Sequence, residues 1–139
     1  MKDLTILYLT ASQIPENFAK YQRKVLLEAI DEYPLISVSR VPLNFGKNMI
    51  DTGIKGPDNI YRQMLNGAKI AETDYIAIAE DDVLYHKAHF NFYRPDKNTF
   101  AYNQNRFALF NWGTPTYSWR NRKSNCSLIA PRGLMIEAL

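Results

Sequence analysis

Cysteine is nearly missing from the sequence, because Cys126 is the single example in 139 residues. One thiol excludes an internal disulfide framework and any zinc site built from several cysteines. No apolar run is long enough to span a bilayer, and the opening MKDLTILYLTAS lacks the charge and length pattern of a signal peptide. These absences predict a soluble, cytoplasmic protein without a transmembrane segment.

The sequence also lacks a strong excess of either charge. Its 17 lysines and arginines against 14 acids leave a net charge of +3, short of the dense basic stripe of a dedicated nucleic-acid binder. Hydrophobic residues make up 46% and charged residues 22%, values typical of a folded globular chain. The length predicts a single domain over residues 1–139.

Three apolar stretches alternate with two helical patterns in the first part of the chain. Residues 4–10 (LTILYLT), 34–43 (PLISVSRVPL) and 75–79 (YIAIA) are apolar and partly β-branched, and they predict strands. Residues 18–30 (FAKYQRKVLLEAI) repeat apolar residues at helical spacing, and a second helix is expected to begin at 57–59. This order predicts an α/β fold with a Rossmann-like, mostly parallel sheet flanked by helices.

The same patterns predict details of packing and connection. Helical spacing over residues 18–30 predicts one buried helix face. Residues 44–58 (NFGKNMIDTGIKGPD) hold three glycines and a proline, and they are predicted to form a loop. A long irregular loop of this kind is usually functional or mobile. The predicted buried face consists of Phe18, Tyr21, Val25, Leu26 and Ala29.

The C-terminal half, residues 91–139, has a looser pattern than residues 1–90. The stretch TFAYNQNRFALF predicts a short antiparallel strand or hairpin, and SLIAPRGLMIEAL predicts a last strand followed by a helix. Between them lie Trp112, Tyr117 and Trp119, close to several basic residues. These rings are either a platform that stacks on sugars or bases, or core residues of a hairpin, and both interpretations remain open.

Three consecutive acids, Glu80, Asp81 and Asp82, end the third apolar stretch in DYIAIAEDDVLY. Like charges this close raise each other's pKa, and a divalent cation among them would relieve the repulsion. Carboxylate oxygens suit Mg²⁺ or Mn²⁺, and Glu80 and Asp82 are the natural pair because one residue separates them. In parallel sheets, ligands bind beyond the carboxyl ends of strands, where these acids are expected. A solvated acidic turn is the alternative.

Three segments together resemble a known family: LTILYLTAS, GPDNIYRQMLNGAKIAETDYIAIAEDDVLY and CSLIAPRGLMIEAL. They are similar to the nucleotide-sugar-dependent glycosyltransferases of the A-type fold, particularly the family 2-like members. The likeness covers residues 4–90 well and the remainder loosely, and DYIAIAEDDV is its most specific part. It implies a glycosyltransferase A-type fold, compact or truncated, with residues 1–90 as the nucleotide-sugar half and 91–139 on the acceptor side.

The resemblance also implies roles for individual residues. The strand-end acids match the family's DXD motif, so Asp82, with Glu80, would hold Mn²⁺ or Mg²⁺ against the diphosphate of a nucleoside diphosphate sugar. A UDP-sugar is the leading candidate for the donor, and Asp81 would lie either between the two metal ligands or reach toward the donor's ribose. The nucleobase and ribose would lie against Thr10, Ala11 and Ser12. Arg62 or Gln63 would approach the diphosphate or ribose, although the family's Ala-Arg-Asn stretch reads Tyr61-Arg62-Gln63 here.

Acids are scarce after residue 82, where only Asp96 and Glu137 occur. Inverting members of the family use a carboxylate from this part of the chain as the base that deprotonates the acceptor hydroxyl. Asp96 is the candidate base, and a capping or solvated acid in YRPDKN is its alternative. The family's domains are generally longer, so a compact variant, a fragment and a homo-oligomer that completes its site all remain open. The acceptor is undetermined among glycan, protein, lipid and nucleic acid.

Glycine is missing from TASQIPEN, the segment directly after the first predicted strand. Sugar-nucleotide pyrophosphorylases and Rossmann oxidoreductases need a glycine-rich phosphate loop there, so both are disfavoured. Phosphatases of the haloacid dehalogenase type carry their paired aspartates after the first strand, not the third. The remaining alternative to a glycosyltransferase is a non-catalytic nucleotide-sugar-binding or assembly module with the same fold.

Overall fold

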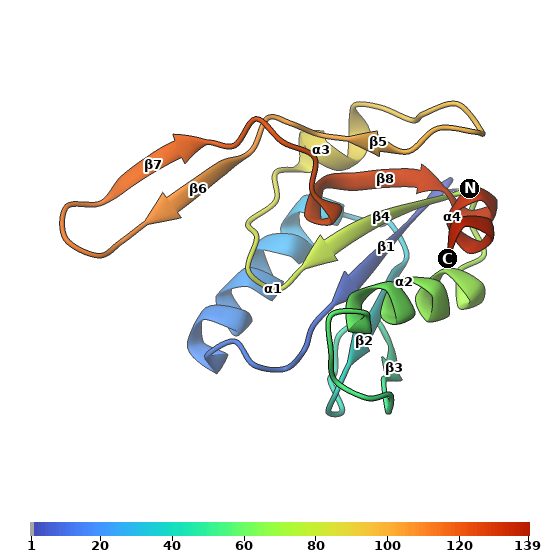
Figure 1. Cartoon of the computed structure of the whole chain (residues 1–139), viewed down its shortest axis with the longest axis horizontal. Coiled ribbons are helices and arrows are strands. Elements are labelled where there is room, and N and C mark those ends of the chain that lie inside the picture. Colours follow the sequence, from blue (N-terminus) through green and yellow to red (C-terminus); the bar gives the residue numbers. More distant parts are fainter. Residues whose placement is uncertain (1) are drawn as a thin grey trace.

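A six-stranded mixed sheet forms the centre of the molecule (Figure 1). The computed structural model describes residues 2–139. Along the sheet the order is β3-β2-β1-β4-β8-β5, with β1 to β4 parallel and β8 antiparallel to both of its neighbours. The strands are β1 (Leu4–Leu9), β2 (Leu35–Ser39), β3 (Lys47–Ile50), β4 (Tyr75–Glu80), β5 (Ala101–Tyr102) and β8 (Leu128–Pro131).

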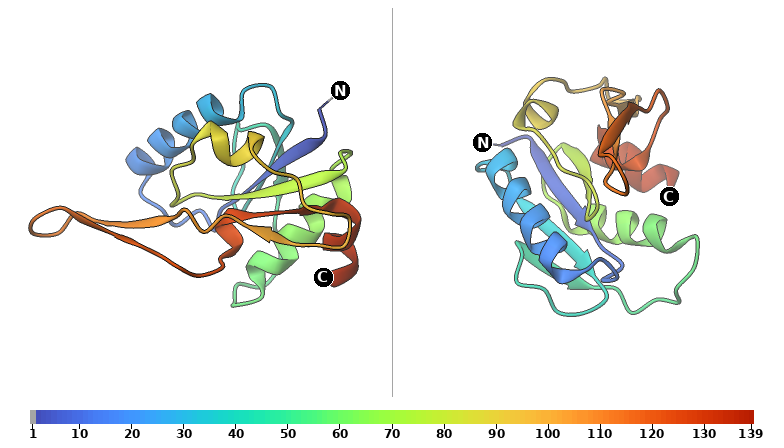
Figure 2. Two further views of the ribbon diagram at one scale, coloured as in Figure 1. Left: turned by 90° about the horizontal axis from the view of Figure 1, so that it is seen from above. Right: turned by 90° about the vertical axis from the view of Figure 1, so that its left-hand side faces the viewer.

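Helices cover both faces of this sheet, as the views in Figure 2 show. One face carries α1 (Glu16–Ile30) and the short α3 (Lys87–Asn91), and the other carries α2 (Asn59–Ile70) and α4 (Arg132–Ala138). The predicted α/β class with a mostly parallel, Rossmann-like sheet is therefore confirmed. Within residues 2–139, no helix is long and apolar enough to cross a membrane.

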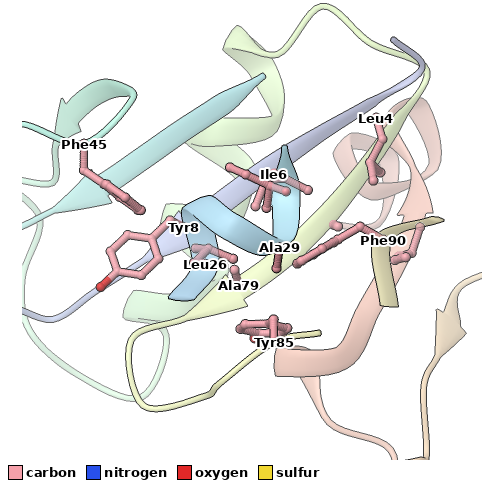
Figure 3. Packing of buried hydrophobic residues seen from close by; sticks show 12 residues of the cluster. Leu4, Ile6, Tyr8, Leu26, Ala29, Phe45, Ala79, Tyr85 and Phe90 are labelled. Atoms are coloured by element: carbon pink, nitrogen blue, oxygen red, sulfur yellow. The ribbon is translucent and has the colours of Figure 1, made fainter. Parts of the chain in front are cut away.

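Alternation along β1 divides its side chains between two cores. Ile6 and Tyr8 face α1 and α3, whereas Leu7 and Leu9 face α2 and α4. Figure 3 shows the first core, where the ring of Tyr8 meets Phe45 edge-on with centroids 4.9 Å apart. Burial on both sides explains why β1 and β4 are continuous apolar runs.

The buried face of α1 differs from the predicted one. Phe18 and Tyr21 are exposed, so that part of the prediction is wrong, whereas Leu26 and Ala29 are buried as expected. A polar residue, Gln22, is fully buried on this face. Its Nε2 donates to the carbonyl oxygens of Glu80 and Val83 at 3.2 and 2.8 Å, which ties α1 to the end of β4.

The segment predicted as a long loop contains β3, a parallel edge strand. Only residues 40–46 join β2 to β3, a shorter link than the helical crossover usual between parallel strands. Asn48 stabilises this link, since its amide donates to the hydroxyls of Ser37 and Ser39 and its oxygen accepts from the Leu43 N–H. Gly46 has a positive φ of 61°, and an added Cβ would lie 2.4 Å from a backbone oxygen.

Two further strands, β6 (Phe107–Phe110) and β7 (Thr116–Trp119), pair only with each other. They form an antiparallel ribbon that projects away from the layered body (Figures 1 and 2). The prediction of an antiparallel addition in the C-terminal half is thereby confirmed. Trp112, Tyr117 and Trp119 are all exposed, which rules out the interpretation that they fill the core.

Candidate functional site

A pocket of about 300 Å³ lies at the carboxyl edge of the sheet, beyond β1 and β4. From β1 the chain adds strands on one side, then returns through α2 to place β4 on the other side. The strand order therefore reverses between β1 and β4, and open α/β sheets bind ligands in the crevice at such a point. The pocket is lined by Leu9, Thr10, Ala11, Gly56, Pro57, Asn59, Ile60, Gln63, Glu80, Asp81 and Asp82.

Hydrogen bonds within this pocket join the ends of β1, β4 and α2. The Thr10 hydroxyl donates to a carboxylate oxygen of Asp81 at 2.6 Å and accepts from the Ser12 N–H at 2.9 Å. The Gln63 side chain donates to the Thr10 carbonyl oxygen at 3.3 Å. Segments more than 50 residues apart in the sequence thus hold one another in place at this edge.

Two buried side chains from outside the pocket fix where β4 ends. The Tyr85 hydroxyl donates to the Cys126 carbonyl oxygen at 2.6 Å and accepts from the Glu80 N–H at 3.0 Å. Gln22 holds the Glu80 carbonyl oxygen from the α1 side. Because the backbone of Glu80 is held on both sides, the direction in which the three acids leave the sheet is set by the fold.

The acids differ in environment although they are consecutive. Burial, followed by the charges of Asp82 and Asp81, raises the pKa of Glu80 from 4.5 to about 7, and the charge of Arg106 opposes the rise. Burial also raises the pKa of Asp81, against the hydrogen bond from Thr10, which lowers it. Asp82 is exposed. Glu80 is therefore the group whose charge state responds to pH and ligands near neutrality.

Arg62, predicted to approach a diphosphate, is instead paired with an acid. Its Nε and Nη2 lie 3.2 Å from the two carboxylate oxygens of Asp51, and Arg40 Nη1 lies 3.3 Å from the same carboxylate. Burial acts to raise the pKa of Asp51, but hydrogen bonds from Arg62, Gly53 and Arg40 lower it overall. Asp51 lies in the loop between β3 and α2, Arg62 in the first turn of α2 and Arg40 directly after β2. Arg62 does not line the pocket.

Ser12 and Asp96 also lie outside the pocket. The Ser12 hydroxyl accepts from the Arg40 N–H at 3.2 Å, and its backbone has a positive φ of 58°. Asp96 is exposed beside the amino end of β4, where the Tyr75 hydroxyl donates to the Pro95 carbonyl oxygen at 2.9 Å. Asp96 is thus at the opposite edge of the sheet from the acids.

Sequence reasoning missed several groups at the site. Gly56 and Pro57, just before α2, and Asn59 and Ile60, at its start, line the pocket, and a proline followed by Asp58 and Asn59 was the signal available for them. Arg106, between β5 and β6, acts on Glu80 electrostatically, and its buried Nε and Nη2 have no hydrogen-bond partner. No sequence spacing connects Arg106 with Glu80, because the contact depends on how β8 and the ribbon fold back.

The three acids differ in whether their carboxylates are free to bind a metal ion. Nowhere in residues 2–139 do three or more histidine, cysteine or acidic side chains gather as ligands for one ion. Asp81 is engaged by Thr10, which leaves Glu80 and Asp82. A site of one or two carboxylates completed by phosphate oxygens and water is the usual form for Mg²⁺. Glu80 and Asp82 supply two carboxylates of the kind that such a site uses.

No protein-family model matches the sequence, and no curated protein matches it. The pocket at the carboxyl edge is therefore the feature of this chain that points to a function.

Proposed function

We propose that the pocket binds a nucleoside diphosphate sugar with Mg²⁺ or Mn²⁺, and that the protein transfers the sugar to an acceptor hydroxyl. The observation that carries this proposal is the position of three acids and Thr10 at the point where the strand order reverses. Nucleotides bind at that point in sheets of this kind. The resemblance to A-type glycosyltransferases favours a UDP-sugar as donor.

The pocket residues have distinct roles in this proposal. Thr10, Ala11 and Gln63 line the wall against which the nucleoside would lie, and Asp81, aligned by Thr10, is placed to accept from a ribose hydroxyl. Glu80 and Asp82 would hold the cation. When bound, the cation supplies neutralisation of the charge that develops on the departing diphosphate.

The electrostatics of the pocket support cation binding. A carboxyl with a pKa of about 7, such as Glu80, is partly protonated at neutral pH. Binding of a divalent cation favours the charged form, so it should release a proton from Glu80 and be tighter at higher pH.

The second candidate is a nucleotide-sugar-binding module without turnover. It is favoured by the position of Asp96 at the opposite edge, since no acid after residue 82 in the described chain lines the pocket. Turnover separates the two functions: release of free sugar from a bound donor identifies the enzyme, whereas binding without release identifies the module.

Calorimetry provides the direct test of binding. UDP, GDP, CDP and dTDP are titrated with and without Mn²⁺ into the wild-type protein and into Asp82→Asn and Asp96→Asn. Both substitutions remove one exposed charge, but only Asp82 lines the pocket. We expect one diphosphate to bind in a manganese-dependent manner, with affinity lost in Asp82→Asn and kept in Asp96→Asn. Failure of all four to bind, or equal loss in both variants, would contradict the proposal.

A further inference from the structure

The ribbon formed by β6 and β7 has one face made entirely of large apolar side chains. Register places Phe107 opposite Trp119 and Leu109 opposite Tyr117, so all four lie on the same face. Their exposed fractions are 49%, 57%, 71% and 72%, respectively. We call residues 107–119 the arm and these four residues its aromatic face.

The other face of the arm is smaller and partly covered. It carries Ala108, Thr116, Ser118 and Phe110, whose ring meets Trp112 edge-on at 5.0 Å and lies under the Arg120 guanidinium at 5.6 Å. Phe110 and Trp112 thus pack together on this side. On the aromatic face, the rings of Phe107 and Tyr117 meet across the strands at 5.8 Å, and Trp119 Nε1 donates to the Gln104 carbonyl oxygen at 2.8 Å. The two faces differ although the strands are only four residues long.

Isolated two-stranded ribbons are marginally stable in water, and additional strands or a covering layer are needed to fix them. The arm pairs with no strand of the main sheet, and both of its outer edges are open for pairing. An exposed apolar face on such a ribbon is a feature of interaction sites. These properties point to a partner that covers the aromatic face.

Charge restricts what that partner can be. Residues 107–119 contain no charged side chain. Arg106, Arg120, Arg122 and Lys123 flank the arm in the sequence, and the guanidinium of Arg120 lies over Phe110, on the face opposite the aromatic face. A single-stranded nucleic acid needs cations along the stacking surface as well as rings. An uncharged apolar face instead fits another uncharged apolar face, and a second copy of the chain presents one.

We propose that two copies of the protein form a dimer in which the aromatic faces of their arms pack together. A two-fold axis makes such a contact self-complementary. Taking about 200 Å² for a free aromatic side chain, the two faces together bury roughly 900 Å². That area is near the lower limit of about 1,000 Å² for a specific interface, so a dissociation constant in the micromolar range is expected.

Sedimentation velocity over a range of protein concentrations tests this dimer. We expect the mass to rise with concentration from 16.1 kDa to twice that value. Both tryptophans of the chain, Trp112 and Trp119, lie in the arm, so their emission should shift to shorter wavelength over the same range. A wild-type protein that stays monomeric up to about 1 mM would overturn the proposal.

Neighbouring residues on opposite faces of β7 provide matched variants. Tyr117→Glu puts a charge on the aromatic face, whereas Thr116→Glu puts the same charge on the other face, and both positions are exposed. We expect the dissociation constant to rise more than about tenfold for Tyr117→Glu and to stay unchanged for Thr116→Glu. Equal effects, or none, would place the interface elsewhere. Circular dichroism of each variant checks that the fold is retained.

A titration with a single-stranded oligonucleotide tests whether nucleic acid, rather than a second copy of the chain, covers the aromatic face. If the oligonucleotide quenches the tryptophan emission of a protein that stays monomeric, and added salt weakens this quenching, then the aromatic face binds nucleic acid and the dimer is refuted. None of these measurements depends on nucleotide-sugar binding, so the dimer and the proposed function fail independently.

Discussion

Glu80→Gln should change how stability depends on pH. Burial raises the pKa of Glu80 from 4.5 to about 7, so the folded protein holds this proton more tightly than the unfolded chain does. Its contribution to stability is present below about pH 4.5 and is lost as the pH rises toward 7. At about 1.4 kcal/mol for each pKa unit, the upper limit is about 3 kcal/mol, and partial exposure reduces the expectation to about 2 kcal/mol.

His89 should act in the opposite direction. Burial lowers the pKa of its imidazole from 6.5 to about 4, and its Nε2 is buried without a hydrogen-bond partner. The unfolded chain therefore takes up this proton more readily, and stability present above about pH 6.5 is lost as the pH falls toward 4. Between about pH 4.5 and 6.5 the two contributions oppose each other in the wild-type protein.

Urea unfolding of the wild type, Glu80→Gln and His89→Asn at four pH values between about 4.5 and 7.5 measures both effects. Far-UV circular dichroism is the suitable signal, since both tryptophans lie in the arm and do not report on the core. As the pH rises, we expect the free energy of unfolding of the wild type, relative to that of Glu80→Gln, to fall by about 2 kcal/mol. Relative to that of His89→Asn, it should rise by a similar amount. Parallel curves for all three proteins would refute the reasoning.

Two further substitutions test the packing around α2. Gly67→Ala should destabilise the protein by about 1–2 kcal/mol in urea unfolding, because the new Cβ would lie 2.2 Å from a buried methyl group of Leu7, and overpacking exceeds the gain in helix propensity. Gly133→Ala in α4 meets nothing within 4 Å and should be neutral or stabilising, so equal effects at the two glycines would contradict this account. Asp51→Ala should cost about 2–3 kcal/mol, since it leaves Arg62 and a second arginine without their shared carboxylate; a loss below about 0.5 kcal/mol would show that the cluster is not stabilising.

The layered sheet was predictable because its parallel strands are apolar on both faces and its helices show a clear period. β3 was not, since KNMI is short and half polar, and its pairing depends on the side chain of Asn48 rather than on an apolar pattern. The face of α1 was misassigned because a search for apolar residues passes over Gln22. Its amide is fully buried yet bonded to the end of β4.

For the site, the sequence predicted which strand ends meet but not which side chains remain free. Thr10, Ala11, Gln63 and the acids lie together because the carboxyl ends of β1 and β4 are neighbours. The resemblance implied that Arg62 or Gln63 approaches the diphosphate or ribose, but a carboxylate 11 residues away in the sequence engages Arg62. Competition of this kind between partners is settled only by three-dimensional distances.

The arm leaves and rejoins the sheet at a single place. Tyr102 at the end of β5 is paired with Leu128 at the start of β8, and the Asn103 N–H donates to the Ser127 carbonyl oxygen at 3.1 Å. The two strands would therefore stay neighbours if a tight turn replaced the residues between them. Because residues 107–119 contribute no lining residue to the pocket, the length and sequence of the arm can change, and with them the choice of partner, while the pocket between β1 and β4 is retained.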